Sequence, residues 1–214
     1  MRAAIKYWHQ HHGPLPAIPH IVTPAKPEPR TRWMTRAEAA RLLRAARRTS
    51  TRGRPSIARF ILIGLYTGSR SGVIKSLRWD WIDFDAGTMR RRAPRANERK
   101  NKRAPIVKLG RRILAHLRRW HRLDGSKAVY VCERNGAPFN RMFYSWEKVL
   151  HLSGLDDSDG RVTPHIMRHT RATWLMQAGI DPWEAAGHLG MSVQTLIRNY
   201  GHHHPDFQSR AAEV

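Results

Sequence analysis

The chain has 214 residues, of which 41% are hydrophobic and 26% are charged, a composition typical of a globular protein with a sizeable core. No run approaches the roughly 20 apolar residues of a membrane-spanning helix, and the N-terminus lacks an apolar signal-peptide core. The single cysteine, Cys132, has no partner for an internal disulfide. These features exclude a disulfide-rich secreted protein and favour a cytoplasmic one.

Charge is the strongest compositional signal. Lysine and arginine together number 39 against 16 aspartates and glutamates, which gives a net charge of +23. A compact body with this charge repels itself, so a polyanionic partner is expected, and nucleic acid is the first candidate. An anionic membrane surface is the alternative, but no lipidation motif or basic amphipathic anchor accompanies the charge.

The first part of the chain differs from the rest in composition. Residues 13–33 are rich in proline and basic residues and lack a helical period, which predicts an extended linker. The residues before them fit one short helix, which is too small to fold alone. We therefore expect residues 1–32 to be a short helix and linker that precede a single folded domain over residues 33–214.

Helices are predicted for the first part of this domain. Thr35 and Glu38 have the spacing of a capping box, which begins a helix that continues to about residue 47. The apolar face of this helix consists of Ala39, Leu42, Leu43 and Ala46. A second helix, apolar on nearly all sides and so expected in the core, begins near Pro55 and ends before Gly68. A short helix follows from about Gly72 to Leu77.

A small sheet is predicted next. Two alternating stretches, WIDFD and TMRRR, are joined at residues 85–87, and a third, APIVKL, follows a basic loop. Their period of two predicts three antiparallel strands. Residues 128–133, AVYVCE, fit a further strand or extended segment. The predicted fold class is therefore mainly α with a small three-stranded antiparallel sheet.

The remaining segments are again helical. One helix covers residues 111–123 with an apolar side of Ile113, Leu114, Leu117, Trp120 and Leu123. Asn140 is expected to cap a helix whose inner face is Met142, Phe143, Trp146, Val149 and Leu150. A helix from Pro164 to Ala178 ends at Gly179. Asp181 caps the next helix, which ends near Gly190, and Ser192 caps a last helix that leads into Tyr200.

Three segments carry polar residues that a core alone does not explain. In TGSR, Arg70 sits at a glycine-containing turn that opens a helix, where backbone N–H groups and a guanidinium together favour a phosphate. In PHIMRHT, His165 and Arg168 are three residues apart, so they share a helix face and suit two oxygens of one phosphate. Either motif alone is weak, because arginines and histidines at such positions are usually solvated surface residues.

The third segment is RNYGHHHPD, in which Tyr200 lies at the end of a short helix. A tyrosine beside cations that bind phosphate can act as a covalent nucleophile. By default it would be a core aromatic residue whose hydroxyl reaches water.

In combination these motifs resemble the catalytic domain of the tyrosine recombinases, or phage-type integrases, over about residues 33–205. The shared features are an arginine after TG, a lysine in a strand hairpin, HxxRH, an LG-x-S helix turn and a tyrosine near the C-terminus. The stretches that carry them are YTGSRSGVIKSLRWDWIDFD, TPHIMRHTRATWLMQAGIDPWEAAGHLGMS and LIRNYGHHH.

The resemblance implies a mechanism without metal, ATP or another cofactor. Tyr200 would attack a DNA phosphodiester, giving a 3′-phosphotyrosyl bond and a free 5′-hydroxyl, and the reverse attack would rejoin the strand. Arg70 and Arg168 match the two arginines that hold the nonbridging oxygens. His165 matches the histidine that hydrogen-bonds the phosphate and helps to move the tyrosine proton.

The resemblance also requires a lysine that protonates the leaving 5′-oxygen. Lys100, in the basic segment NERKNKRAP, is the predicted residue, and Lys102 is its rival. The other reading of this segment makes it a set of DNA-backbone contacts, and we assign Lys102 and Arg103 to that role.

Three departures from the family pattern stand out. Val73 occupies a position that is usually acidic, and Met191 one that is usually His or Trp, where a thioether cannot donate a hydrogen bond. His188, three residues earlier, is a possible auxiliary residue in place of Met191. The segment RAAIKYWHQHHG resembles only the end of the helical domain that usually precedes the catalytic domain.

The resemblance implies binding partners for the chain, and one alternative function stays open. The expected partners are double-stranded DNA and other recombinase protomers on it, in the cytoplasm and associated with the nucleoid. The histidines at 202–204 are not expected to bind metal, because adjacent histidines on a tail cannot all face one site.

The alternative function is that of a decayed or truncated integrase that binds DNA without efficient catalysis. A type IB topoisomerase fits less well, because the spacing from LG-x-S to the tyrosine resembles that of an integrase.

Overall fold

The computed structural model describes residues 2–14, 32–49, 56–91, 106–139, 142–155, 162–209 and 211–213. It divides into two compact units, residues 1–31 and 32–214. The first unit contains one helix, α1 (Arg2–His11), as expected for this segment. The predicted linker lies almost entirely outside the described residues.

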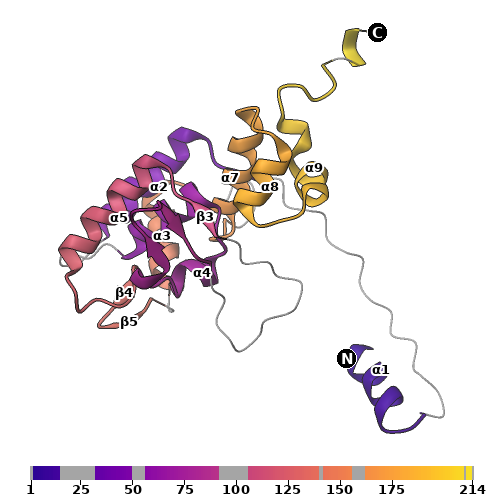
Figure 1. Cartoon of the computed structure of the whole chain (residues 1–214), viewed down its shortest axis with the longest axis horizontal. Helices are drawn as coiled ribbons and strands as arrows, with labels where there is room; N and C mark the ends of the chain where they lie inside the picture. The colour runs from indigo at the N-terminus through magenta and orange to yellow at the C-terminus, as the bar shows by residue number, and fades with distance from the viewer. Residues whose placement is uncertain are drawn as a thin grey trace. The chain divides into compact units, whose positions relative to one another are not determined.

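The second unit contains the other elements (Figure 1). Its helices are α2 (Arg36–Arg48), α3 (Ser56–Thr67), α4 (Ser71–Lys75), α5 (Arg111–Asp124), α6 (Phe143–Ser153), α7 (Ile166–Gln177), α8 (Pro182–Leu189) and α9 (Val193–Tyr200), with 3-10 turns at Trp79–Trp81, Gly201–His203 and Ala211–Glu213. Its strands are β1 (Ile82–Asp83), β2 (Thr88–Met89), β3 (Val107–Lys108), β4 (Glu133–Arg134) and β5 (Ala137–Pro138). The predicted fold class, mainly α with a small three-stranded antiparallel sheet, is confirmed.

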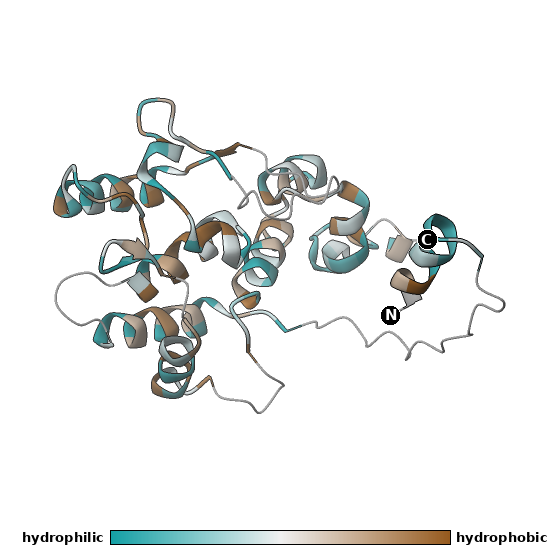
Figure 2. Cartoon of the chain, turned by 90° about the horizontal axis from the view of Figure 1, so that it is seen from below, coloured by the Kyte–Doolittle hydropathy of each residue, from teal (hydrophilic) through white to brown (hydrophobic). Residues whose placement is uncertain are grey.

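The helix α3 forms the centre of the main core. Every residue from Ile57 to Leu65 is buried, and α3 packs against α2 and α7, while α2 also packs against α6. One of these buried residues is charged. Arg59 forms an ion pair with Asp124 of α5, with Nη1 at 2.6 Å from Oδ2, and it also donates to the Val131 carbonyl. This pairing lets a guanidinium sit among apolar side chains. Figure 2 shows hydrophobic and hydrophilic residues alternating along the other helices, as expected for amphipathic elements.

The sheet has the order β1-β2-β3, and both pairs are antiparallel. Met89 lies opposite Ile82 on one side and Val107 on the other, and all three side chains are buried. The strand period therefore places one face of the sheet on the core. The predicted joint at residues 85–87 is a turn in which Gly87 has φ of +61°.

The local helix signals are confirmed where they lie in the described residues. The Thr35 hydroxyl accepts from the Glu38 N–H, and the Glu38 carboxylate accepts from the Thr35 N–H. The Asp181 carboxylate accepts from two N–H groups of α8, and the Ser192 hydroxyl accepts from the Thr195 N–H. Two boundaries differ from prediction, because α4 spans Ser71–Lys75 and α7 begins at Ile166.

Two predicted core residues are wrong. Leu123 is 66% exposed, and the next residue, Asp124, turns inward instead because Arg59 supplies a counter-charge there. Phe143 is 57% exposed at the first position of α6, where its ring contacts Tyr144 rather than the core. The predicted cap of α6, Asn140, lies outside the described residues.

A second apolar cluster lies between α7, α8 and α9. It contains Ala172, Leu175, Met176, Ala185, Ala186, Leu189, Leu196 and Tyr200. The helix α7 belongs to both clusters, since Ile166, Met167 and Trp174 pack into the main core. The helix α7 is therefore packed between the main core and the second apolar cluster. No helix in the part of the chain that the structure describes has the length and apolar character to cross a membrane.

Candidate active site

The candidate site is built on the turn that follows α3. Thr67 ends this helix, and its hydroxyl donates to the Ile63 carbonyl and accepts from the Ser69 N–H. Gly68 has φ of +60°, and a Cβ there would lie 2.4 Å from the Leu189 side chain, so the turn requires glycine. Arg70 follows directly as the N-terminal cap of α4. The TGSR motif is thus a tight turn that fixes the position of Arg70.

Arg168 connects this turn to the second cluster. It lies on α7, is 6% exposed, and its Nη1 donates to the Gly68 carbonyl at 2.8 Å and to the Leu189 carbonyl at 2.6 Å. Among the described residues its other two nitrogens form no hydrogen bond, so they remain available as donors. Burial and the charge of Arg70 lower the pKa of Arg168 to about 10, which leaves it charged at neutral pH.

Arg91 reaches the same turn from the sheet, and the sequence analysis did not identify it. Its Nε donates to the Ser69 hydroxyl at 2.9 Å and its Nη2 to the Thr67 carbonyl at 2.5 Å. Burial, followed by the charges of Arg168 and Arg70, lowers the pKa of Arg91 to about 9. The strand period that buries Met89 also turns Arg91 inward and leaves Arg90 exposed, and this alternation was the available signal.

Tyr200 ends α9 and is 7% exposed. Its Oη lies 2.7 Å from Nδ1 of His169, a residue for which the sequence analysis assigned no role although it completes the HxxRH motif. Burial raises the pKa of Tyr200, and the charge of Arg168 partly offsets the effect. The tyrosine is therefore protonated at neutral pH and hydrogen-bonded to a histidine.

His165 lies at the N-terminal end of α7, where it is exposed. Its ring is 4.8 Å from that of His169 and nearly perpendicular to it, while the His169 and Tyr200 rings are 5.8 Å apart. Partial removal from water, then the charges of Arg168 and Arg70, lower the pKa of His165. The structure therefore brings His165 beside the arginines, while His169 is the hydrogen-bond partner of the Tyr200 hydroxyl.

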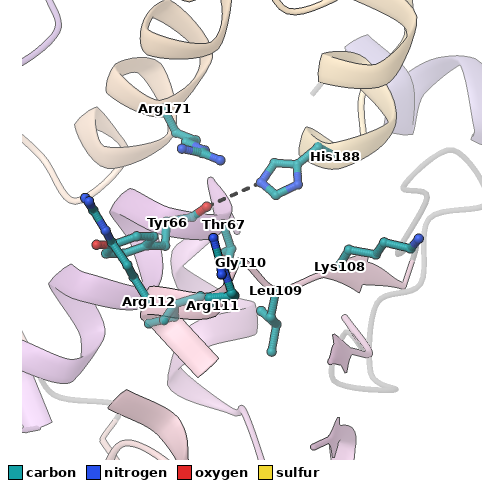
Figure 3. A pocket seen from close by; sticks show the side chains of 10 residues that line it. Tyr66, Thr67, Lys108, Leu109, Gly110, Arg111, Arg112, Arg171 and His188 are labelled. Atoms are coloured by element: carbon teal, nitrogen blue, oxygen red, sulfur yellow. Dashed lines mark hydrogen bonds between the residues drawn. The ribbon is translucent and has the colours of Figure 1, made fainter. Parts of the chain in front are cut away.

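The two auxiliary residues occupy different surroundings. Met191 is partly buried and packs on the second cluster, which includes Tyr200. His188 points toward the Tyr66 carbonyl, with Nε2 at 3.3 Å from that oxygen (Figure 3). It lines a cavity of about 290 Å³ beside the Thr67 turn, together with Tyr66, Lys108, Arg111 and Arg171. Burial, then the charges of Arg171 and Arg91, lower the pKa of His188 to about 4.

The structure gives less information on the remaining predicted site residues. Val73 is partly buried in α4, and its N–H donates to the Arg70 carbonyl. Lys100, Lys102 and Arg103 lie outside the described residues, between β2 and β3. No group of three or more His, Cys, Asp or Glu side chains that could hold a metal ion occurs among the residues described.

Comparisons with known proteins identify the family of the chain. The sequence profile described as "Phage integrase family" matches residues 32–206. A curated relative from Sinorhizobium fredii, "Putative integrase/recombinase y4gC", is 30% identical over 155 residues, which is 71% of this chain and 77% of the relative.

Two solved structures share the fold. The catalytic domain of bacteriophage HP1 integrase matches with a TM-score of 0.60 at 18% identity, covering 85% of this chain and 94% of that one. The Tn1549 transposon integrase, solved in complex with a circular intermediate DNA, matches with a TM-score of 0.66 at 18% identity, covering 89% and 67%. The chain therefore belongs to the phage integrase family, the tyrosine recombinases.

Proposed function

We propose that this protein is a site-specific DNA recombinase that cuts and rejoins DNA through a covalent bond to Tyr200, without metal or ATP. One observation carries the proposal. A tyrosine hydroxyl that is hydrogen-bonded to a histidine lies close to arginines that form no ion pair with any described carboxylate. Cations without counter-charge beside a nucleophile suit a phosphodiester.

The chemical step forms a bond between Tyr200 Oη and phosphorus and breaks the bond from phosphorus to the 5′-oxygen. Negative charge builds on the nonbridging oxygens during the attack. Arg70 and the free nitrogens of Arg168 would neutralise it, and because Arg168 is already fixed by two carbonyls it needs no reorganisation. Losing one such donor typically costs roughly 10²–10³ in rate.

Protons must leave Tyr200 and reach the 5′-oxygen. His169 Nδ1, at 2.7 Å from Oη, is placed to accept the tyrosine proton as the bond forms. His165 would donate a hydrogen bond to the phosphate from the neighbouring ring position. Lys100 is the proposed donor to the departing 5′-oxygen, with Lys102 as its rival. Rejoining reverses each transfer.

Double-stranded DNA and further protomers assembled on it are the proposed partners. The net charge of +23 supports the first, as do the structural neighbours solved as DNA complexes, the Tn1549 integrase and XerH recombinase. Val73 and Met191 favour the second candidate, a family member that binds DNA without efficient catalysis. In that case Met191 contributes packing against the Tyr200 cluster but no hydrogen bond to phosphate.

The decisive experiment incubates the protein with nicked DNA duplexes that trap the covalent intermediate, in the presence of EDTA. We expect an adduct that resists SDS in the wild type and is absent in Tyr200→Phe, which keeps the ring in its cluster and removes only the nucleophile. DNA binding without any adduct in the wild type would favour the non-catalytic candidate. An adduct that requires added magnesium would contradict the metal-free mechanism.

A further inference from the structure

Arg91 is a buried arginine that the proposed chemistry does not use. It is 4% exposed, and it contacts the turn that carries Arg70 at two points, through the Ser69 hydroxyl and the Thr67 carbonyl. Its third nitrogen, Nη1, is buried and has no hydrogen-bond partner among the described residues. A buried donor without a partner is costly, so its presence calls for an explanation.

Another buried arginine, outside the candidate site, provides the comparison. Arg59 is 2% exposed and is neutralised by Asp124 through two hydrogen bonds of 2.6 and 2.8 Å. Arg91 has no such carboxylate within the part of the chain that the structure describes, and neither do Arg70 and Arg168. Three guanidinium groups thus gather around one turn without a counter-charge from the described residues.

Their mutual repulsion adds to the effect of burial on their pKa values. Burial, and then the charges of Arg168 and Arg70, lower the pKa of Arg91. Burial, and then the charge of Arg70, lower the pKa of Arg168. A cluster of this kind is destabilised in isolation and is stabilised when an oxyanion enters it.

We propose that Arg91 is a positioning residue of the phosphate site, which holds the Thr67–Arg70 turn in place and supplies a third positive charge to the cluster. This inference rests on the proposed function, in which a DNA phosphate is the missing counter-charge. Arg168 holds the same turn from the opposite element, through the Gly68 carbonyl. Arg91 and Arg168 therefore hold the turn from two elements, and this restricts the backbone orientation of Arg70.

The first test replaces Arg91 with lysine. This keeps the charge but removes the planar guanidinium, which reaches Ser69 through Nε and Thr67 through Nη2. We expect the rate of adduct formation at saturating DNA to fall about 10–100-fold per folded molecule, while DNA affinity changes less than about threefold. Arg59→Lys is the matched control, since it alters an equally buried arginine away from the site, and its adduct rate per folded molecule should stay at the wild-type value. Equal rates for Arg91→Lys and wild type would overturn the proposal.

Ser69→Ala covers the case in which Arg91→Lys does not fold. It removes the acceptor of Arg91 Nε without changing any charge. A smaller loss of adduct rate, about threefold to tenfold, is expected at unchanged DNA affinity. A wild-type rate in Ser69→Ala would argue against the turn-holding role.

The second test uses sulfate as a probe oxyanion and measures the melting temperature. Sulfate below about 10 mM, at constant ionic strength, should stabilise the wild type and Arg59→Lys through binding at the cluster, and should not stabilise Arg91→Gln. Equal stabilisation of Arg91→Gln would overturn the inference. This measurement needs no DNA cleavage, so it decides on Arg91 even if the wild type forms no adduct, in which case the proposed function fails separately.

Discussion

A partly buried histidine beside arginines is held in its neutral form, and His188 is an example. Its ring meets the Tyr66 carbonyl, and its nearest charges are those of Arg171 and Arg91. The folded protein therefore binds a proton at His188 only near pH 4, whereas an unfolded chain does so near the ordinary value of 6.5. Between these values the unfolded state binds more protons, so acid favours unfolding.

This asymmetry predicts a pH dependence of stability. Because the folded-state pKa of His188 is depressed from 6.5 to about 4, its effect is absent above pH 6.5 and destabilises the fold progressively as the pH falls toward 4. The loss at pH 5 is at most about 2 kcal/mol. In His188→Gln, urea denaturation at pH 7 and pH 5 should give a correspondingly smaller difference than in the wild type. The exposed His202→Gln is the control, and a wild-type difference in His188→Gln would contradict the prediction.

Sequence motifs located part of the site and missed the rest for a definable reason. Arg70, Arg168 and Tyr200 belong to motifs with fixed local spacing, so a single chain identifies them as candidates, and the structure places them within range of one another. Arg91 is hydrogen-bonded to the Ser69 hydroxyl, 22 residues away in the sequence. His169 is hydrogen-bonded to the Tyr200 hydroxyl, 31 residues away. Such pairings depend on how the elements pack, which local spacing does not determine.

The crossing of α3 and α7 helps to position the site, because α7 carries Arg168 and α3 leads into the Thr67–Arg70 turn. At this crossing a Cβ on Gly64 would lie 2.6 Å from the Met167 sulfur and 3.2 Å from its Cβ. The helices approach this closely only because residue 64 has no side chain. Met167 and Arg168 are adjacent, so any displacement of α7 here also moves the guanidinium.

Two glycine substitutions should therefore have opposite effects. Gly64→Ala gains helix propensity but overpacks the crossing, and a net loss of about 1–2 kcal/mol in unfolding free energy is expected. Gly187→Ala, on the exposed side of α8 with open space around the added carbon, should gain up to about 1 kcal/mol. Urea denaturation of both variants checks this, and stabilisation by Gly64→Ala would show that the crossing tolerates a methyl group.

Element boundaries were predictable where a side chain caps the backbone and less so elsewhere. Asp181 and Ser192 begin helices by bonds within three residues, and both signals can be read from sequence. The inward face of α5 could not be read in the same way. Hydropathy favours Leu123 over Asp124, and only the presence of Arg59 inside the core reverses the choice.

On the scale of the whole molecule, charge decides how the protein meets its substrate. A net charge of +23 on 214 residues produces a positive field that is attracted to any DNA, whatever its sequence. Contacts with phosphates release condensed counter-ions, so affinity from this source depends on salt. The charge can be counted from sequence, whereas the grouping of three arginines around one turn appears only after folding.

DNA affinity should accordingly fall steeply as salt is added. The logarithm of the association constant is expected to fall linearly with the logarithm of salt concentration, with a slope of about 0.9 per neutralised phosphate. Fluorescence anisotropy with a labelled duplex, compared with a duplex of scrambled sequence, measures this slope and the sequence preference. An affinity that stays constant with salt would contradict binding through phosphates.

The two carbonyls that accept hydrogen bonds from Arg168 couple its position to the packing of α8. One belongs to Gly68, in the turn after α3, and the other to Leu189, at the C-terminal end of α8. If α8 and α9 detach from the rest of the domain, Tyr200 moves away with α9 and Arg168 loses its hydrogen bond to the Leu189 carbonyl. Under the proposed function, a partly opened molecule would therefore lose DNA cleavage while the positive charge of the rest of the chain still attracts DNA.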